Sequence, residues 1–202
     1  MRVMPRTGFV LLSIALAAIV PGTIAEAYSD KAFRAHPAAE YAHQISGHVT
    51  IGAKPYNSEG LIAEVFGKKT DLLKYGVLPV LMVVENKGQK TLDLRALEIN
   101  LVSADGRHVG PIAPEDIQYL RKTSPRATVT PLPVPLPRKK NPLSAPELTT
   151  RAFAAQMLPP GDSASGFFYF EARPEPGDKL YVNGLRNAPN GPEIMYFEFP
   201  ID

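Results

Sequence analysis

The stretch GVLPVLMVVENKGQKTLDL, residues 76–94, predicts the fold of this chain. Its first ten residues are aliphatic and rich in β-branched side chains, which is typical of a strand buried on both faces. Asn86 and Gly88 supply turn chemistry, because asparagine tolerates a left-handed backbone and glycine adopts it freely. Residues 91–103 then alternate between apolar and polar side chains. We therefore expect the chain to turn and return as a strand that begins at Leu92.

Glu85 and Asn86 place a carboxylate and an amide at this corner, which raises the question of a reactive site. Such a site needs a base, a nucleophile or further ligands beside these groups. None lies close to Glu85 in the sequence. We interpret the corner as architectural and expect Asn86 to contribute to stability.

The N-terminus has the pattern of a secretory signal peptide. Arg2 and Arg6 precede an apolar run at residues 8–20, and Ala25 and Ala27 provide an A-x-A cleavage site. This run of thirteen residues is shorter than the ~20 that a transmembrane helix needs. An uncleaved N-terminal anchor is the alternative interpretation.

Cleavage after Ala27 divides the chain into three parts. We predict a signal peptide over residues 1–27, a loosely ordered lead-in over residues 28–46 and a single β-sandwich domain over residues 47–202. Because the sequence contains no cysteine, the mature protein has neither disulfides nor a thiol for lipid attachment. The expected location is the bacterial periplasm or the external medium, with no membrane span after cleavage.

The charge balance argues against nucleic acid as a partner. The chain has 22 Lys and Arg against 20 Asp and Glu, and loss of residues 1–27 removes two arginines and one glutamate, which leaves a net charge of +1. No long basic block is present to follow a phosphate backbone.

Short strand patterns separated by turn residues recur along the chain. The further strand patterns occupy residues 47–56, 108–112, 167–174, 179–185 and 193–202, and Asp105 and Gly106 mark a hairpin turn. Helical patterns are short, at residues 59–66 after a possible N-cap at Ser58, at 113–122 and at 147–158. These patterns indicate a mainly β fold, an antiparallel immunoglobulin-like β-sandwich with short helical insertions.

A proline-rich segment, residues 130–146, interrupts this pattern. Repeated proline is incompatible with a central strand or a helix interior, so we predict an extended loop on the surface. Its prolines recur at every second residue, unlike the PxxP spacing of polyproline ligands. Its basic end, formed by Arg138, Lys139 and Lys140, is a candidate contact with a partner or an envelope surface.

Four segments resemble bacterial exported domains with an immunoglobulin-like sandwich, which are known mainly as families of unknown function. The segments are FGKKTDLLKYGVLPVLMVVENKGQKTL, EINLVSADGRHVGPIAPEDI, LPPGDSASGFFYFE and IMYFEFPI. The resemblance spans residues 53–201 and implies a fold and an export route. It brings no catalytic residues with it.

Two patterns invite comparison with hydrolases and nucleotide-binding loops. GDSASG contains Ser163, and DGRH offers the pair Asp105 and His108, but their order and the turn context differ from those of serine hydrolases. GKKT at residues 67–70 lacks the glycine that a phosphate-binding loop needs upstream. We interpret GDSASG and DGRH as turns and reject GKKT as a phosphate loop.

A metal site is the other chemical alternative. His36, Glu40 and His43 would share one face of a helix, with His48 nearby, but Pro37 interrupts the helical pattern. No recognised ligand spacing is met, so exposed and solvated side chains are the expectation.

The strongest binding signal is aromatic. In FFYFE, alternation places Phe167 and Tyr169 on one face of a strand and Phe168 and Phe170 on the other. One face must belong to the core, and the second is either covered or exposed to a partner or a sugar. Phe168 and Phe170 are therefore candidate contact residues.

The sequence thus predicts an exported, non-enzymatic β-sandwich that serves as a binding or accessory module of the bacterial cell envelope. The expected partner is an envelope protein or polymer, and neither a cofactor nor a metal is expected. The alternative is an exported hydrolase or a metal-binding protein. The oligomeric state does not follow from the sequence.

Overall fold

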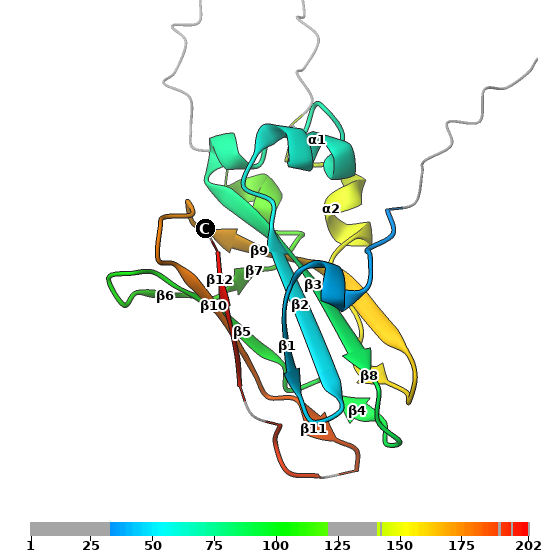
Figure 1. Cartoon of the computed structure of the whole chain (residues 1–202). Helices are drawn as coiled ribbons and strands as arrows, with labels where there is room; N and C mark the ends of the chain where they lie inside the picture. Colours follow the sequence, from blue (N-terminus) through cyan, green and yellow to red (C-terminus); the bar gives the residue numbers. More distant parts are fainter. Residues whose placement is uncertain (1–32, 121–140, 142, 190, 195, 202) are drawn as a thin grey trace, which may run out of the picture. The chain divides into compact units, whose positions relative to one another are not determined.

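The computed structural model describes residues 33–120, 141, 143–189, 191–194 and 196–201. These residues form a mainly β protein with antiparallel sheets and two α-helices (Figure 1). The predicted mainly β, antiparallel class is therefore confirmed. The predicted signal peptide and the basic residues Arg138, Lys139 and Lys140 lie outside the described residues. Among the residues described, no helix has the length and apolar content needed to cross a membrane.

The largest sheet has five strands, with the predicted buried strand at its centre. The order across it is β1 (Ala42–Ser46), β2 (Val49–Pro55), β3 (Val77–Asn86), β9 (Ser163–Glu171) and β7 (Pro111–Ile112). Every residue of β3 except Glu85 is buried, as its aliphatic run predicts. β3 and β9 run antiparallel, with Glu85 opposite Ser163 and Val77 opposite Glu171.

A second sheet of four strands packs against the first. Its order is β12 (Phe197–Pro200), β10 (Lys179–Asn183), β5 (Glu98–Val102) and β6 (His108–Val109). The hairpin between β5 and β6 closes as predicted, since Ser103 N–H donates to the Arg107 carbonyl and Gly106 has a φ of +83°.

A small third sheet lies at one end of the molecule and corrects one prediction (Figure 1). It contains β11 (Arg186–Asn187), β4 (Leu92–Asp93) and β8 (Met157–Leu158). The expected single return strand over residues 91–103 is wrong, because β4 and β5 belong to different sheets and neither pairs with β3. Leu92 and Leu94 are buried in the core, so the chain crosses between the sheets here.

The first core fills the space between the two larger sheets. Alternate residues of every facing strand contribute, including Ile51, Val80, Met82, Leu101, Leu180, Phe170, Phe197 and Phe199. Period-two alternation in β5, β10 and β12 places their apolar side chains in this core and their polar ones outside.

The second core covers the opposite face of the five-stranded sheet. α1 (Glu59–Phe66), α2 (Pro146–Thr150) and the 3₁₀ turns η2 (Leu73–Tyr75) and η3 (Ile117–Tyr119) contribute to it. The Ser58 hydroxyl accepts from Leu61 N–H, and Gly67 ends α1, as predicted. The five-stranded sheet is therefore packed on both faces.

The described part of the N-terminal lead-in, residues 33–46, is more ordered than predicted. Residues 38–46 form the 3₁₀ turn η1 (Ala38–Glu40) and strand β1, an edge strand of the five-stranded sheet. Gly52 allows η1 to lie on the sheet, because a Cβ there would stand 2.5 Å from the Ala38 carbonyl oxygen.

Three other expectations change. The helix expected over residues 147–158 ends at Thr150, after which Arg151 and Phe153 pair with Phe167 of β9 through main-chain hydrogen bonds. The helix expected over residues 113–122 is only the turn η3 within the described residues. At the end of the predicted proline-rich surface loop, Leu143 is buried and Pro146 already belongs to α2.

Candidate functional site

The aromatic strand β9 does not offer the face that its sequence suggested. Phe167 and Tyr169 lie in the second core, where Phe66 packs edge-on against Phe167 with ring centroids 5.0 Å apart. Phe170 is fully buried between the two larger sheets. The prediction of Phe170 as a partner contact is therefore wrong, because each face of β9 has a core of its own.

Phe168 differs from Phe170 because it is half-buried. Its ring stacks on Phe153 at 5.3 Å and lines a groove of about 610 Å³. At the rim of the groove, Arg95 and Asp93 form an ion pair of 2.6 Å, and the hydrogen bond from Arg95 lowers the pKa of Asp93 to about 2. The groove is lined by both polar and apolar groups, and its one basic side chain, Arg95, is already paired with Asp93.

The serine and histidine of the hydrolase alternative lie far apart. Ser163 begins β9, whereas His108 lies in β6, on an edge of the other sheet. Phe170 follows Ser163 by seven residues, roughly 23 Å along a strand, and it is Phe170 that pairs with Pro111, close to His108. The fold does not bring Ser163 and His108 together.

Glu85, the carboxylate at the predicted corner, has a structural role. Its carboxylate accepts a hydrogen bond from Ala38 N–H at 2.8 Å and forms an ion pair with the Lys87 ammonium at 3.0 Å. Burial alone would raise the pKa of Glu85, but these two interactions outweigh it and lower the pKa. A carboxylate held in its charged form in this way anchors η1 to the sheet and is a poor general base.

The histidines of the metal alternative are dispersed. His36 and Glu40 form an exposed pair at 3.1 Å, while His43 Nδ1 lies 3.0 Å from the Tyr41 carbonyl. His48 Nε2 is 3.0 Å from Asn187 Oδ1. Among the described residues, no three histidine or acidic side chains gather as a metal site requires.

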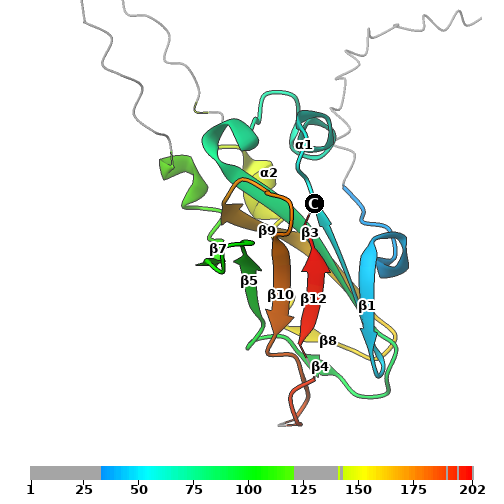
Figure 2. The ribbon, with the colours of Figure 1, turned by 60° about the vertical axis from the view of Figure 1, so that its left-hand side comes forward.

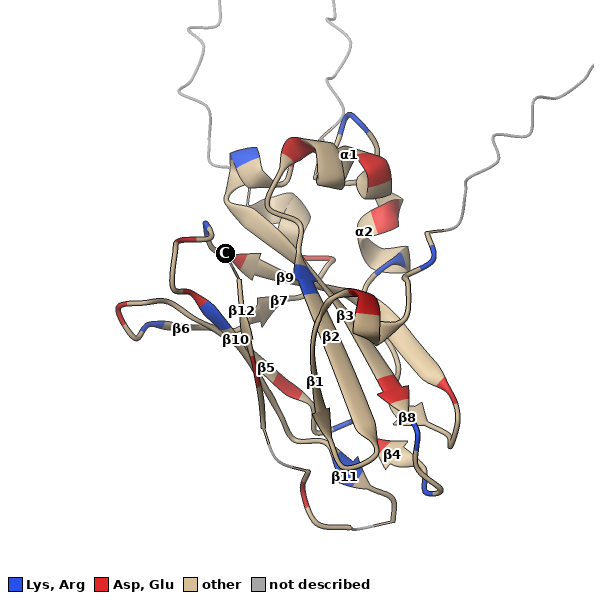
Figure 3. Cartoon of the chain, in the orientation of Figure 1, with Lys and Arg blue, Asp and Glu red and all other residues tan. Residues whose placement is uncertain are grey.

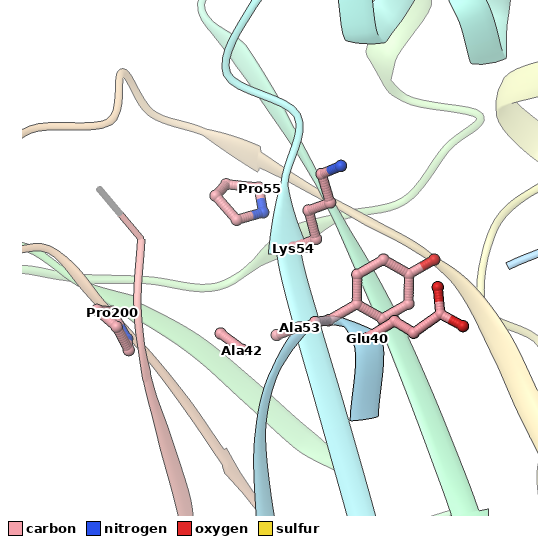
Figure 4. Close-up of a pocket in the computed structure, with 7 residues that line it drawn as sticks. Glu40, Ala42, Ala53, Lys54, Pro55 and Pro200 are labelled. Atoms are coloured by element: carbon pink, nitrogen blue, oxygen red, sulfur yellow. The ribbon is translucent and has the colours of Figure 1, made fainter. Parts of the chain in front are cut away.

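The seam between the two larger sheets is closed at one edge by a side chain. Gln44 of β1 donates its amide to the Glu198 carbonyl of β12 at 2.5 Å and accepts from Glu198 N–H at 3.0 Å. Beyond this contact the strands leave a cavity of about 470 Å³ beside Ala42, Lys54 and Pro200 (Figure 4). Lys54 and Glu40 point in different directions in this cavity, so its charged groups do not converge on one point.

The outer face of the four-stranded sheet is the broad face that sequence reasoning missed. In Figure 2 no described element lies over β5, β10 and β12. Their outward residues are Glu98, Asn100 and Val102 of β5, Lys179, Tyr181 and Asn183 of β10, and Glu198 and Pro200 of β12. The alternation in KLYVN and FEFP predicts which side chains point outward from these strands, but it does not predict whether another element covers them.

A pair of tyrosines stands on this outer face. The rings of Tyr181 and Tyr196 are nearly parallel, 27° apart, with centroids separated by 6.3 Å. Tyr196 is 60% exposed, which is unusual for so large a side chain. In register with Tyr181 lies Glu198, whose carboxylate also pairs with Lys179 at 2.6 Å. We call the surface formed by Asn100, Lys179, Tyr181, Asn183, Tyr196 and Glu198 the tyrosine face.

Comparison with known proteins identifies no family. No family model and no curated protein matches the chain. Among solved structures, YcdA of Bacillus subtilis, described as a "putative lipoprotein", has 13% identity and a TM-score of 0.42. The similarity covers 79% of this chain, which spans only 38% of that protein.

Two further solved structures also match 79% of this chain. YjhA of Bacillus subtilis has 13% identity and a TM-score of 0.42, with coverage of 79% and 96%. A DUF4426 family protein of Pseudomonas aeruginosa has 12% identity and a TM-score of 0.31, with coverage of 79% and 95%. At these values the similarities assign neither a family nor a function. The class that the fold itself defines is a mainly β protein with antiparallel sheets, and within the described residues no element covers the outer face of the four-stranded sheet.

Proposed function

We propose that this protein is an exported, non-enzymatic β-sandwich of immunoglobulin-like topology that acts as a binding or accessory module of the bacterial cell envelope. The observation that carries the proposal is the tyrosine face. The five-stranded sheet is packed on both sides, whereas no element of the described part of the chain covers the outer face of the four-stranded sheet, which carries Tyr196 at 60% exposure.

The strand order supports the immunoglobulin-like topology. In that fold, strands A, B, E and D form one sheet and strands C, F and G form the other. With β2, β3, β5, β7, β9, β10 and β12 taken as A to G in chain order, the observed sheets read A-B-E-D and G-F-C. β1 and β6 are then additions at the edges.

The geometry of the polar groups supports a binding role over a catalytic one. Ser163 and His108 lie apart, and Glu85 is engaged by Ala38 and Lys87. In the cavity beside β12, the carboxylate of Glu40 and the ammonium of Lys54 do not converge. A catalytic site needs convergent groups at hydrogen-bond distances.

Export rests on the N-terminal pattern of a basic region, an apolar run and an A-x-A site. The expected product is a periplasmic or secreted protein that begins at Tyr28. Expression of the full chain in a bacterium, cell fractionation and mass measurement of the product test this. A cytoplasmic product that keeps residues 1–27 would overturn the export part of the proposal.

The binding part is tested by capture from native envelope extract. The wild-type protein should retain an envelope protein or polymer, and Tyr196→Ala should lose it. Tyr119→Ala is the matched control, because Tyr119 is 76% exposed but lies on η3, away from the four-stranded sheet. Equal capture by wild type and Tyr196→Ala would refute the tyrosine face as the binding surface.

A further inference from the structure

We infer that the ligand of the tyrosine face is a neutral glycan chain. This inference rests on the proposed function, since it names the chemical class that the binding module takes. Three features of the face carry it: an ordered aromatic ring, a set of polar groups at its rim, and the absence of surplus positive charge on the outward residues of β5, β10 and β12.

The aromatic feature is Tyr196 supported by Tyr181. The ring of Tyr181 is half-buried and lies nearly parallel to that of Tyr196, so it limits the orientations that the exposed ring adopts. A ring held in this way offers a flat apolar surface at little cost in side-chain entropy. The C–H groups on one face of a sugar ring pack well against such a surface, while the sugar hydroxyls remain free to form hydrogen bonds.

The polar feature is a network centred on Glu198. Its carboxylate pairs with Lys179 at 2.6 Å and with the Tyr181 hydroxyl. The interaction with Lys179, followed by that with Tyr181, lowers the pKa of Glu198, so the group stays charged and accepts hydrogen bonds at neutral pH. On the main chain, Gln44 fixes both polar groups of Glu198 from the neighbouring sheet. The network is therefore ordered before a ligand arrives.

Two amides lie beside this network on the same face of the sheet. Asn100 lies directly opposite Tyr181 on β5, and Asn183 lies two residues beyond Tyr181 on β10. An amide offers both a donor and an acceptor, which suits the hydroxyl pairs of a sugar. The polar groups spread over three adjacent strands, so they match an extended chain better than a single small molecule.

The charge on the face selects against an anionic polymer. Lys179 is compensated by Glu198, and Glu98 adds a further negative charge. Figure 3 shows basic and acidic positions mixed across the molecule, with no basic stripe along β5, β10 and β12. An anionic polysaccharide or a phosphate-rich lipid surface would meet net repulsion here, whereas an uncharged glycan meets no such penalty.

The test is affinity electrophoresis of the mature secreted protein in gels that contain one polymer each. The probes are laminarin, hydroxyethyl cellulose, dextran and mannan as neutral glycans, and alginate as an anionic one. The wild type should be retarded by at least one neutral glycan and not by alginate. Tyr196→Ala should weaken this binding about tenfold, since the loss of an aromatic contact of about 1.4 kcal/mol changes the dissociation constant by that factor, whereas Tyr119→Ala should bind like the wild type.

The outcomes separate this inference from the proposed function. The first outcome is capture of an envelope protein that Tyr196→Ala abolishes, without retardation by any neutral glycan. It would refute the inference of a glycan ligand and support the proposed function as a binding module. Equal retardation of the wild type and Tyr196→Ala would overturn the tyrosine face as the glycan site. Absence of both glycan binding and envelope capture would overturn both. Circular dichroism of each variant confirms that a loss of binding is not a loss of fold.

Discussion

The side-chain amide of Asn86 donates a hydrogen bond of 2.9 Å to the carbonyl oxygen of Leu158, 72 residues further along the chain. The same amide donates to the Lys90 carbonyl at 2.8 Å, and its oxygen accepts from Gly88 N–H at 3.0 Å. One buried side chain thus shapes the turn after β3 and joins it to β8. This corner, which contains the one carboxylate of β3, therefore has a structural role.

Asn86→Ala should therefore destabilise the protein by about 2 kcal/mol, because it leaves buried main-chain groups without partners. For a domain of this size that corresponds to a fall in Tm of roughly 4–8 °C. Thermal unfolding followed by circular dichroism measures it. Gln89→Ala, an exposed change in the same turn, is the control. A wild-type Tm for Asn86→Ala, together with altered ligand binding, would contradict the structural interpretation.

The close approach of η1 to the sheet gives a second prediction. Gly52→Ala places a Cβ 2.5 Å from the Ala38 carbonyl oxygen, so main chain must move and stability should fall by at least about 1 kcal/mol. Gly60→Ala is the matched control, because nothing lies within 4 Å of its new Cβ in α1. Alanine favours the helix over glycine by about 1 kcal/mol, so this control should be neutral or stabilising. Urea unfolding of both variants gives the comparison, and equal stabilities would contradict the packing described.

Local patterns predicted much of the fold from sequence. The aliphatic run of β3, the Ser58 cap and the Asp-Gly turn each depend on neighbouring residues, and each appears in the structure. Partner choice depends on distant residues. The alternation around Leu92 correctly indicates strand structure, but it does not reveal that β4 pairs with β8 and β11 while β5 pairs with β6 and β10.

The same limit explains the error at the aromatic strand. Alternation places Phe168 and Phe170 on one face, and the structure keeps both on the side of the first core. Whether that face meets another sheet depends on where β10 and β12 lie, which the sequence of β9 does not contain. The tyrosine face was missed for the converse reason, because nothing near Tyr181 in the sequence shows that its side of the sheet stays open.

Phe170 provides a direct test of this correction. Phe170→Ala should destabilise the protein by about 3–5 kcal/mol, since it removes a fully buried ring from the first core. Phe168→Ala should cost less, because that ring is half-buried and contacts Phe153 from one side. Chemical denaturation of both variants decides the matter. A Phe170→Ala protein with wild-type stability would contradict the burial of Phe170 and support the original prediction that it contacts a partner at the surface.

The lowered pKa of Glu85 predicts a pH-dependent contribution to stability. A carboxyl group whose pKa is lower in the folded state stabilises the fold above its unfolded pKa, and this contribution disappears as the pH falls through the folded value. Glu85→Gln should therefore be less stable than the wild type at pH 7. The difference should shrink as the pH falls below 4.5, the ordinary value for the group.

Urea unfolding between pH 7 and pH 3 measures this contribution of Glu85. Glu171→Gln, an exposed carboxylate at the far end of β9, is the control and should change little across the range. A stability difference between Glu85→Gln and the wild type that stays constant with pH would show that the carboxylate does not act through its charge.

The contact between Gln44 and Glu198 gives the last prediction. Gln44 offers its side-chain amide where a neighbouring strand would offer main-chain groups, so it joins the edges of two sheets with two hydrogen bonds. Gln44→Ala should leave the Glu198 N–H without its acceptor and raise its hydrogen-exchange rate by about tenfold or more, through local opening. Global stability should fall by no more than about 1 kcal/mol, because the contact is exposed to water.

The control is Ile45→Ala, a change at the next residue of β1, which is 65% exposed. This variant should leave the hydrogen exchange of the Glu198 amide unchanged. Unaltered hydrogen exchange of the Glu198 amide in Gln44→Ala would mean that pairing with β10 alone holds β12 in place. The tyrosine face would then be ordered by the four-stranded sheet without help from β1.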